Sequence, residues 1–297
     1  MRIVITGANG MLGTDAVAYF AAAGHEVVRV DRIAGPDTTV LDITDPHATR
    51  EFIGTIRPDV VLHCAANTNV DGCEREPDGA YKGNALGTWS IAVAAESVGA
   101  TLVAISTDFV FDGSLRRAYT EFDAPNPLGH YGASKLAGER LAMQHCSRTY
   151  IVRTAWLYGI HGRNFPLTIA KRARETTSLS VVGDQHGSPT WTVDLVRRVD
   201  TILQTGLYGV YHATNSGEAT WFDFAQFIVS RLGITGVIVE PITSDEYAVR
   251  FGSPTRRPLY SVLRAYSLEL QGIEAMRPWT EALSQFLDRA VDAGLVG

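Results

Sequence analysis

A tyrosine and a lysine four residues apart are the side chains best suited to chemistry in this sequence. Tyr131 and Lys135 open and close the pentad Y-G-A-S-K. Residues four apart share one face of a helix, so a helix here would direct the phenol and the ammonium group into one site. A free phenol has a pKa of about 10, and a neighbouring cation favours phenolate and lowers that pKa. The spacing predicts that Tyr131 exchanges a proton near neutral pH as a general acid, unless the two are an ordinary surface pair.

Three glycines near the N-terminus predict a cofactor site. A short apolar strand over residues 2–6 runs into Gly7, Gly10 and Gly13, and a helical stretch over residues 14–23 follows. A glycine turn between a strand and a helix lets a pyrophosphate approach the backbone and meet the amide groups of the helix N-terminus. The order of strand, G-x-x-G-x-x-G and helix therefore predicts that a dinucleotide binds here.

An acidic residue ends the second predicted strand, which covers residues 26–30. Asp31 follows the glycine turn by about 20 residues, where a carboxylate accepts a hydrogen bond from the adenosine ribose 2′-hydroxyl. This position favours NAD. Arg32 comes next and is suited to a 2′-phosphate, so the sequence leaves both NADH and NADPH as cofactors.

A third catalytic candidate follows the predicted strand over residues 101–106. Thr107 would lie at the carboxyl end of that strand, the edge where open α/β sheets bind ligands. Its hydroxyl is suited to donating to a substrate oxygen and stabilising the charge that develops there. The alternative is a hydroxyl that closes a local turn. With Tyr131 and Lys135, Thr107 completes the groups needed to reduce a ketone with a nicotinamide.

The alternation of strands and helices predicts an α/β fold, a Rossmann-type doubly wound parallel sheet with a small C-terminal α/β substrate lobe. We expect residues 1–153 to form the dinucleotide-binding domain and residues 154–297 mainly the substrate lobe, with segments that return to the core. Further expected elements are strands over residues 39–43, 59–66, 179–182, 208–213 and 237–241, helices over residues 165–175, 192–205, 222–232 and 278–293, and loops over residues 112–129 and 183–189.

Composition agrees with a globular enzyme. The 297 residues are 45% hydrophobic, enough for a sizeable core, and the net charge is −6 with dispersed basic residues. Nucleic acids and anionic membranes are therefore not expected partners. No apolar run is long enough to span a bilayer and the chain starts with a strand, so we expect a cytoplasmic protein. Cys64, Cys73 and Cys146 predict no disulfide framework, and His63 with Cys73 lacks metal-site spacing, so no protein-bound metal is expected.

Seven sequence blocks resemble the extended short-chain dehydrogenase/reductase family and, within it, the dTDP-4-dehydrorhamnose reductases. The resemblance runs from residue 2 to about residue 287, and Phe109 departs from the usual tyrosine. The blocks are AANTNVD at 65–71, STDFVFDG at 106–113, NPLGHYGASKLAGE at 126–139, RTAWLYG at 153–159, GRNF at 162–165, DQHGSPT at 184–190 and RPLYSVL at 257–263.

The resemblance implies roles for further residues. Lys135 is expected both to lower the pKa of Tyr131 and to hold the nicotinamide ribose. The cofactor residues implied by the motifs are Gly7, Gly10, Met11, Leu12, Gly13, Asp31, Asp42, Ile43, Ala65, Ala66, Asn67, Ile105, Tyr131 and Lys135. The substrate residues implied are Thr68, Val70, Thr107, Asp108, Trp156, Asn164 and Arg257. An indole can cover an apolar sugar face, although Trp156 is also suited to core packing and Arg257 to solvent. Asn84 is expected to be structural.

The resemblance implies NAD(P)H-dependent reduction of the 4-keto group of dTDP-4-dehydro-L-rhamnose to dTDP-L-rhamnose. Two alternatives stay open. One is another reductase of 4-keto-6-deoxysugar nucleotides, such as a dTDP-dihydrostreptose synthase. The other is a non-catalytic NADP-binding protein like the regulatory beta subunit of methionine adenosyltransferase. The resemblance also implies a homodimer, with magnesium at the dimer interface in some members.

Overall fold

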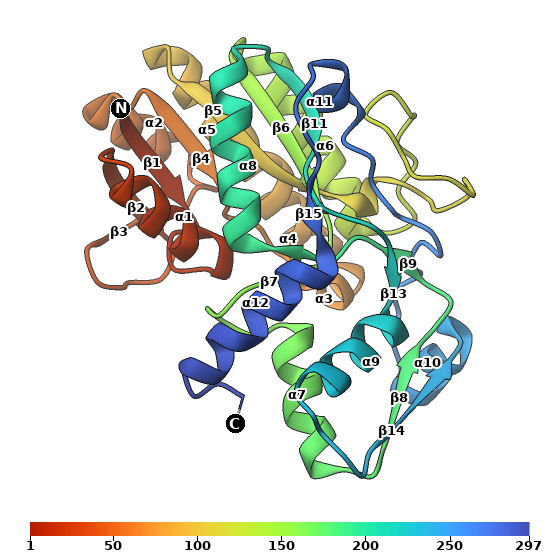
Figure 1. Cartoon of the computed structure of the whole chain (residues 1–297). Coiled ribbons are helices and arrows are strands. Elements are labelled where there is room, and N and C mark those ends of the chain that lie inside the picture. The colour runs from red at the N-terminus through yellow and green to blue at the C-terminus, as the bar shows by residue number, and fades with distance from the viewer. Residues whose placement is uncertain (297) are drawn as a thin grey trace.

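A parallel sheet of seven strands forms the larger part of the molecule (Figure 1). The computed structural model describes residues 1–296. The strands, in order across the sheet, are β11 (Gly209–His212), β6 (Thr149–Thr154), β5 (Thr101–Thr107), β4 (Val60–His63), β1 (Arg2–Thr6), β2 (Glu26–Asp31) and β3 (Thr38–Val40). Every neighbouring pair runs parallel. The central strands read as apolar runs because both faces of the sheet are covered. The predicted fold class is confirmed.

Helices cover both faces of this sheet. On one face α1 (Met11–Ala22) and α8 (Thr192–Thr205) pack Phe20 and Leu195 against Ile5. On the other face lie α2 (Pro46–Ile56), α5 (Gly87–Val98) and α6 (His130–His145), which pack residues such as Ile91 against Val61. A single π-helical turn, η1 (Tyr81–Leu86), leads into α5. The helix that carries the pentad is therefore held along its length by a packed sheet.

A second core lies in the lower part of Figure 1. Its elements are the parallel pair β8 (Ser178–Val182) and β14 (Ile238–Ile242), with α7 (Phe165–Glu175), α9 (Trp221–Arg231) and α12 (Trp279–Asp292). The core combines aliphatic side chains with aromatic ones, among them Trp191, Phe224 and Phe286. The helix α10 (Ser244–Phe251) was not predicted, and it buries none of its residues.

Short elements connect the two cores. They are the two-stranded pairs β7 (Leu157–Tyr158) with β10 (Thr190–Trp191), β9 (His186–Gly187) with β13 (Ala219–Thr220) and β12 (Asn215–Ser216) with β15 (Met276–Pro278), together with α3 (Val70–Arg75), α4 (Pro77–Ala80), η2 (Asp108–Val110) and α11 (Tyr266–Leu270). The strand β11 and the helix α8 lie after residue 154 and join the large sheet. A domain division at residues 153 and 154 stays a prediction.

Several predicted boundaries move in the structure, and the strand expected over residues 39–43 covers only Thr38–Val40. The helix expected over residues 14–23 begins at Met11, because Gly10 is extended and acts as its N-cap. The strand expected over residues 59–66 ends at His63, where the chain leaves the sheet. Within residues 1–296 no helix is long and apolar enough to cross a membrane.

Candidate active site

The glycine turn joins β1 to α1 with no room for side chains. Gly7 has a φ of 67°, and a Cβ there would lie 2.8 Å from the backbone nitrogen of Ala65. A Cβ at Gly13 would overlap the carbonyl oxygen of Gly7. Gly10 leaves the first turn of α1 without a side-chain cap, so its amide groups are available to an anion. The turn thus has the shape and the donors that a pyrophosphate requires.

Asp31 is fixed beside this turn at the end of β2. Its carboxylate accepts hydrogen bonds from the backbone nitrogens of Asn9 and Ile33, each at 3.0 Å. The neighbouring Arg32 is exposed. The glycine turn and Asp31 together fit a nicotinamide adenine dinucleotide, whose adenosine ribose would lie at Asp31.

The two residues expected beside adenine have other partners. Asp42 accepts from the backbone nitrogen and the hydroxyl of Thr44, and these bonds lower the pKa of Asp42. Ile43 packs against Gly87 at the start of α5, where a Cβ would lie 2.9 Å from the Ile43 Cδ1. Both are compatible with the adenine side of the site, and their role there stays a prediction.

The loop after β4 is expected to line the nicotinamide side of the site. The loop holds Ala65, Ala66 and Asn67. The Asn84 side chain accepts from the Asn67 nitrogen at 2.7 Å and donates to the Asn67 oxygen at 3.1 Å. It also donates to Ser134 on α6. Asn84 therefore fixes this loop to the helix that carries the pentad, in agreement with its expected structural role.

The structure brings Tyr131, Lys135 and Thr107 together. Lys135 is buried and its Nζ donates to the carbonyl oxygen of Ile105 on β5 at 2.7 Å. Thr107 ends the same strand, and its hydroxyl lies near enough to the Tyr131 phenol to lower the pKa of that phenol. The Phe109 ring packs edge-on against Tyr131, with centroids 5.5 Å apart. A phenol, an ammonium group and a hydroxyl thus meet at the carboxyl end of β5.

The electrostatics of this group correct one expectation. We expected Lys135 to lower the pKa of Tyr131, but burial raises that pKa above its usual value. The nearby Thr107 hydroxyl opposes the rise in this pKa, and the charge of Asp108 adds to it. Burial also lowers the pKa of Lys135 to about 8, while Glu139 acts in the opposite direction. Tyr131 therefore holds its proton at neutral pH, as suits an acid that donates only to a strong base.

Asp108 links the catalytic strand to the C-terminal half of the chain. It is buried, and burial raises its pKa to about 6. Its carboxylate accepts from the hydroxyl of Ser261 at 2.6 Å and from that of Thr107 at 3.1 Å. Sequence reasoning gave Ser261 no role, because the residue lies 153 positions from Asp108 and only the fold brings them together.

Trp156 adopts a backbone conformation that marks it out from ordinary core residues. Its φ is 47°, in the left-handed region that bulky residues rarely occupy. The indole stacks on that of Trp221, with centroids 3.5 Å apart, and lies against Gly187. The side chain remains partly exposed. It thus belongs to an aromatic cluster and keeps part of its surface exposed, and its contact with a substrate stays a prediction.

The other predicted substrate residues have protein partners. Asn164 caps α7 by accepting from the Leu167 nitrogen at 3.1 Å. Arg257 forms an ion pair with Asp71 at 3.2 Å. Thr68 is exposed and Val70 partly buried, at the start of α3. The structure therefore places Asn164 and Arg257 in intramolecular contacts, and their contact with a substrate stays a prediction.

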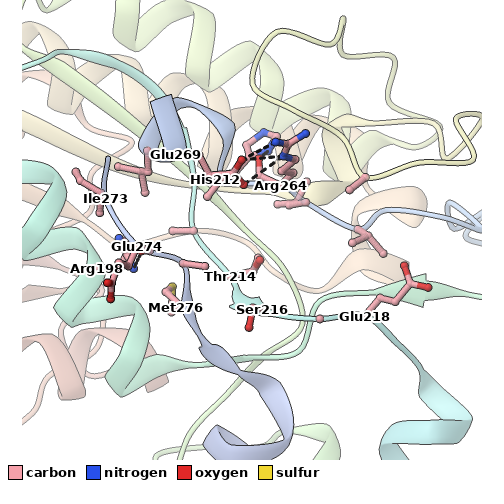
Figure 2. Close-up of a pocket in the computed structure, with 18 of the residues that line it drawn as sticks. Arg198, His212, Thr214, Ser216, Glu218, Arg264, Glu269, Ile273, Glu274 and Met276 are labelled. Atoms are coloured by element: carbon pink, nitrogen blue, oxygen red, sulfur yellow. Dashed lines mark hydrogen bonds and ion pairs between the residues drawn. The ribbon is translucent and has the colours of Figure 1, made fainter. Parts of the chain in front are cut away.

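A cavity of about 300 Å³ lies beside this site and is distinct from it (Figure 2). It is lined by residues after β11, including Thr214 and Ser216, by Glu218 and by the segment that contains Arg264 and Met276. None of the three catalytic candidates lines it. Within residues 1–296 no group of three or more His, Cys, Asp or Glu is placed to hold a metal ion.

The fold and the site define a nicotinamide-dependent oxidoreductase, and the comparisons agree. The family model described as the RmlD substrate binding domain matches residues 1–291. The chain belongs to this family of NAD(P)-dependent dTDP-sugar reductases.

Solved structures and a curated relative match nearly the whole chain. A dTDP-4-dehydrorhamnose reductase from Clostridium acetobutylicum is 45% identical, with a TM-score of 0.91, over 97% of this chain and 99% of that one. The reductase of the same name from Bacillus anthracis, in complex with NADP, is 40% identical with the same TM-score and the same coverage. A dTDP-4-keto-6-deoxy-D-glucose reductase from Streptomyces niveus is 38% identical over 96% of both chains.

Proposed function

We propose that this enzyme reduces the 4-keto group of dTDP-4-dehydro-L-rhamnose and forms dTDP-L-rhamnose. The observation that carries the proposal is the meeting of Tyr131, Lys135 and Thr107 at one end of β5. Two solved relatives that are at least 40% identical are named dTDP-4-dehydrorhamnose reductase. Reduction of a 4-keto sugar nucleotide uses all three side chains, whereas a binding subunit needs no acid.

The residues of the chain divide the work of the reduction. A bound nicotinamide supplies a hydride to C4 of the sugar. The Thr107 hydroxyl holds the C4 oxygen, and Tyr131 donates a proton to that oxygen as negative charge develops on it. Because burial raises the pKa of Tyr131, the phenol keeps its proton until an alkoxide forms. Lys135 stays fixed by Ile105 and would hold the nicotinamide ribose.

Either nicotinamide fits the proposal. Asp31 favours the 2′-hydroxyl of NADH, and Arg32 is suited to the 2′-phosphate of NADPH. The relative from Bacillus anthracis is in complex with NADP. We therefore propose that both are used, with a modest preference for NADH.

A reductase for the unepimerised D-sugar is the second candidate. It is favoured by the relative from Streptomyces niveus, whose name specifies the D-glucose configuration. The two substrates differ at C3 and C5, on the side where Trp156 and Thr68 are expected. Configuration there decides which face of C4 meets the hydride while Tyr131 and Thr107 hold the oxygen.

A coupled assay distinguishes the two substrates. The purified protein is supplied with NADPH and a dTDP-4-keto-6-deoxyglucose, with or without the 3,5-epimerase that converts it to the L-sugar. We expect rapid NADPH oxidation and formation of dTDP-L-rhamnose with the epimerase, and only very slow NADPH oxidation without it. Equal rates in both reactions would assign a D-sugar reductase, and no turnover in either would overturn the proposed function.

We also propose that the enzyme is a cytoplasmic homodimer, as the family resemblance implies. Light scattering on a sizing column is expected to give twice the mass of the 297-residue chain. A magnesium ion at the dimer interface stays a prediction without support from the described residues.

A further inference from the structure

One buried carboxylate lies directly behind the catalytic residues and has no role in the reduction as derived above. Glu139 follows Lys135 by four residues on α6, so Tyr131, Lys135 and Glu139 lie in one row along the helix. Lys135 is 6% exposed and Glu139 4% exposed. Buried charges of this kind are costly unless they are compensated, so a partner is required for each.

Glu139 joins three elements of the active site. Its Oε1 accepts from the hydroxyl of Ser106 at 2.5 Å and from Arg153 Nε at 2.9 Å. Its Oε2 accepts from Arg153 Nη2 at 2.6 Å. Ser106 precedes Thr107 on β5, and Arg153 is its register partner on β6. One carboxylate thus fixes α6, which carries Tyr131 and Lys135, to the strand that ends in Thr107.

Glu139 and Lys135 line the same very small space. It is a cavity of about 10 Å³ whose lining also includes Ile105, Thr88 and Ile151. Such a space is no larger than a single water molecule, so the two charges interact in a poorly screened interior. The other titratable groups around Lys135 are His63 and Cys64. Burial keeps His63 neutral at neutral pH, with a pKa of about 3, and raises the pKa of Cys64 to about 12, so neither contributes a charge there.

We propose that Glu139 is a positioning residue of the reductase, which keeps Lys135 cationic and fixes the catalytic helix to β5. The inference rests on the proposed function, because Lys135 must be charged to hold the nicotinamide ribose while Tyr131 donates its proton. Arg153 pairs with Glu139 through two hydrogen bonds, and Glu139 is nevertheless the carboxylate that raises the pKa of Lys135 against the effect of burial. The negative charge next to Lys135 is therefore that of Glu139.

The test is the variant Glu139→Gln, which keeps the hydrogen bond from Ser106 and removes the charge. We expect the alkaline limb of the kcat profile to move to lower pH by about one unit, because Lys135 loses its proton more easily. The affinity for NADPH, measured by protein fluorescence, is expected to weaken over the same pH range. Glu139→Asp keeps the charge and is expected to restore both profiles.

Two further variants separate this role from a structural one. Glu139→Gln leaves the buried Arg153 guanidinium without its carboxylate partner. The double variant Glu139→Gln with Arg153→Gln removes that unpaired buried cation. We expect the alkaline limb of its kcat profile to shift as in Glu139→Gln alone. Glu121→Gln is the control. It removes a partly buried carboxylate that accepts from the backbone nitrogens of His212 and Ser267 and not from the catalytic strand, and its pH profile of kcat is expected to match that of the wild type.

An unchanged alkaline limb in Glu139→Gln and in the double variant Glu139→Gln with Arg153→Gln would overturn the proposal. If the wild type turns over no dTDP-sugar, the proposed function fails, and the pH dependence of NADPH binding still tests Glu139 by itself.

Discussion

The cofactor side and the substrate side of this molecule hold their functional residues by different means. Lys135 and Thr107 lie within or at the end of long elements, and Lys135 bonds the backbone of the sheet. Trp156 and Arg257 lie between elements and contact side chains far along the sequence, Trp221 and Asp71. A site set by regular elements is built before any substrate arrives, whereas a site set by loop contacts can differ between relatives that share the chemistry. If Trp156 and Arg257 contact the substrate as proposed, this difference would let one family include reductases of several dTDP-sugars.

The largest effect is expected on the cofactor side. Tyr131→Phe removes the proton donor and keeps the ring, so kcat is expected to fall by roughly a hundredfold to ten-thousandfold, the usual contribution of a general acid. NADPH affinity is expected to stay within about twofold of the wild type, measured by fluorescence titration. Tyr208→Phe, at an exposed position, is the matched control. Near-native turnover in Tyr131→Phe would remove this residue from the acid role.

The next effect is a pH dependence of stability that we expect from the buried His212. Burial lowers the pKa of His212 to about 3, and its ring bonds the carbonyl oxygens of Tyr119 and Arg264. The folded state keeps His212 neutral while the unfolded state binds a proton below about pH 6.5, so stability is full above that pH and falls towards pH 3. At pH 5 this residue alone is expected to remove about 2 kcal/mol from the free energy of unfolding.

Urea unfolding at pH 5 and pH 7.5 measures this effect. The loss of stability between the two values is expected to be smaller in His212→Asn than in the wild type, while the exposed His47→Asn behaves as the wild type. The same pH dependence in all three proteins would show that His212 is not the source.

A smaller effect is expected on the preference for NADPH or NADH when Asp31 is replaced. Asp31→Ala removes the acceptor for the ribose 2′-hydroxyl and a negative charge near a 2′-phosphate, so the ratio of kcat/KM for NADPH over NADH is expected to rise by about tenfold. Steady-state kinetics with both nicotinamides measures it. A wild type strictly confined to NADPH would place Asp31 away from the ribose.

The smallest effect is expected at a residue of the substrate side. Asn164→Ala removes the cap of α7 and is expected to lower stability by about 1 kcal/mol. Asn164→Asp keeps an acceptor for the Leu167 nitrogen and is expected to recover most of the loss in a thermal melt. A large rise in KM for the sugar nucleotide at unchanged stability would instead assign Asn164 to the substrate.

Sequence reasoning succeeded where local spacing decides the structure. The four-residue step from Tyr131 to Lys135, the glycines of the turn and the strand before Thr107 predicted the sheet and the meeting of these residues. It did not predict the stack of Trp156 on Trp221 or the bond from Ser261 to Asp108, because these contacts form only in the folded chain. The rise in the pKa of Tyr131 was missed for the same reason, since burial depends on packing.

The central claim is that Tyr131 serves the reduction itself and that Trp156 serves recognition of the sugar. Selectivity between the two 4-keto sugars tests this claim most directly. The measurement is the ratio of kcat/KM for the L-sugar over that for its unepimerised D-sugar precursor, in the wild type, Tyr131→Phe, Trp156→Ala and Trp156→Phe. The account predicts that Tyr131→Phe lowers both values and leaves their ratio within about twofold, because it removes one proton donor common to both reactions. Trp156→Ala is expected to lower the ratio and Trp156→Phe to restore most of it. A ratio that collapses in Tyr131→Phe and is unchanged in Trp156→Ala would contradict the account.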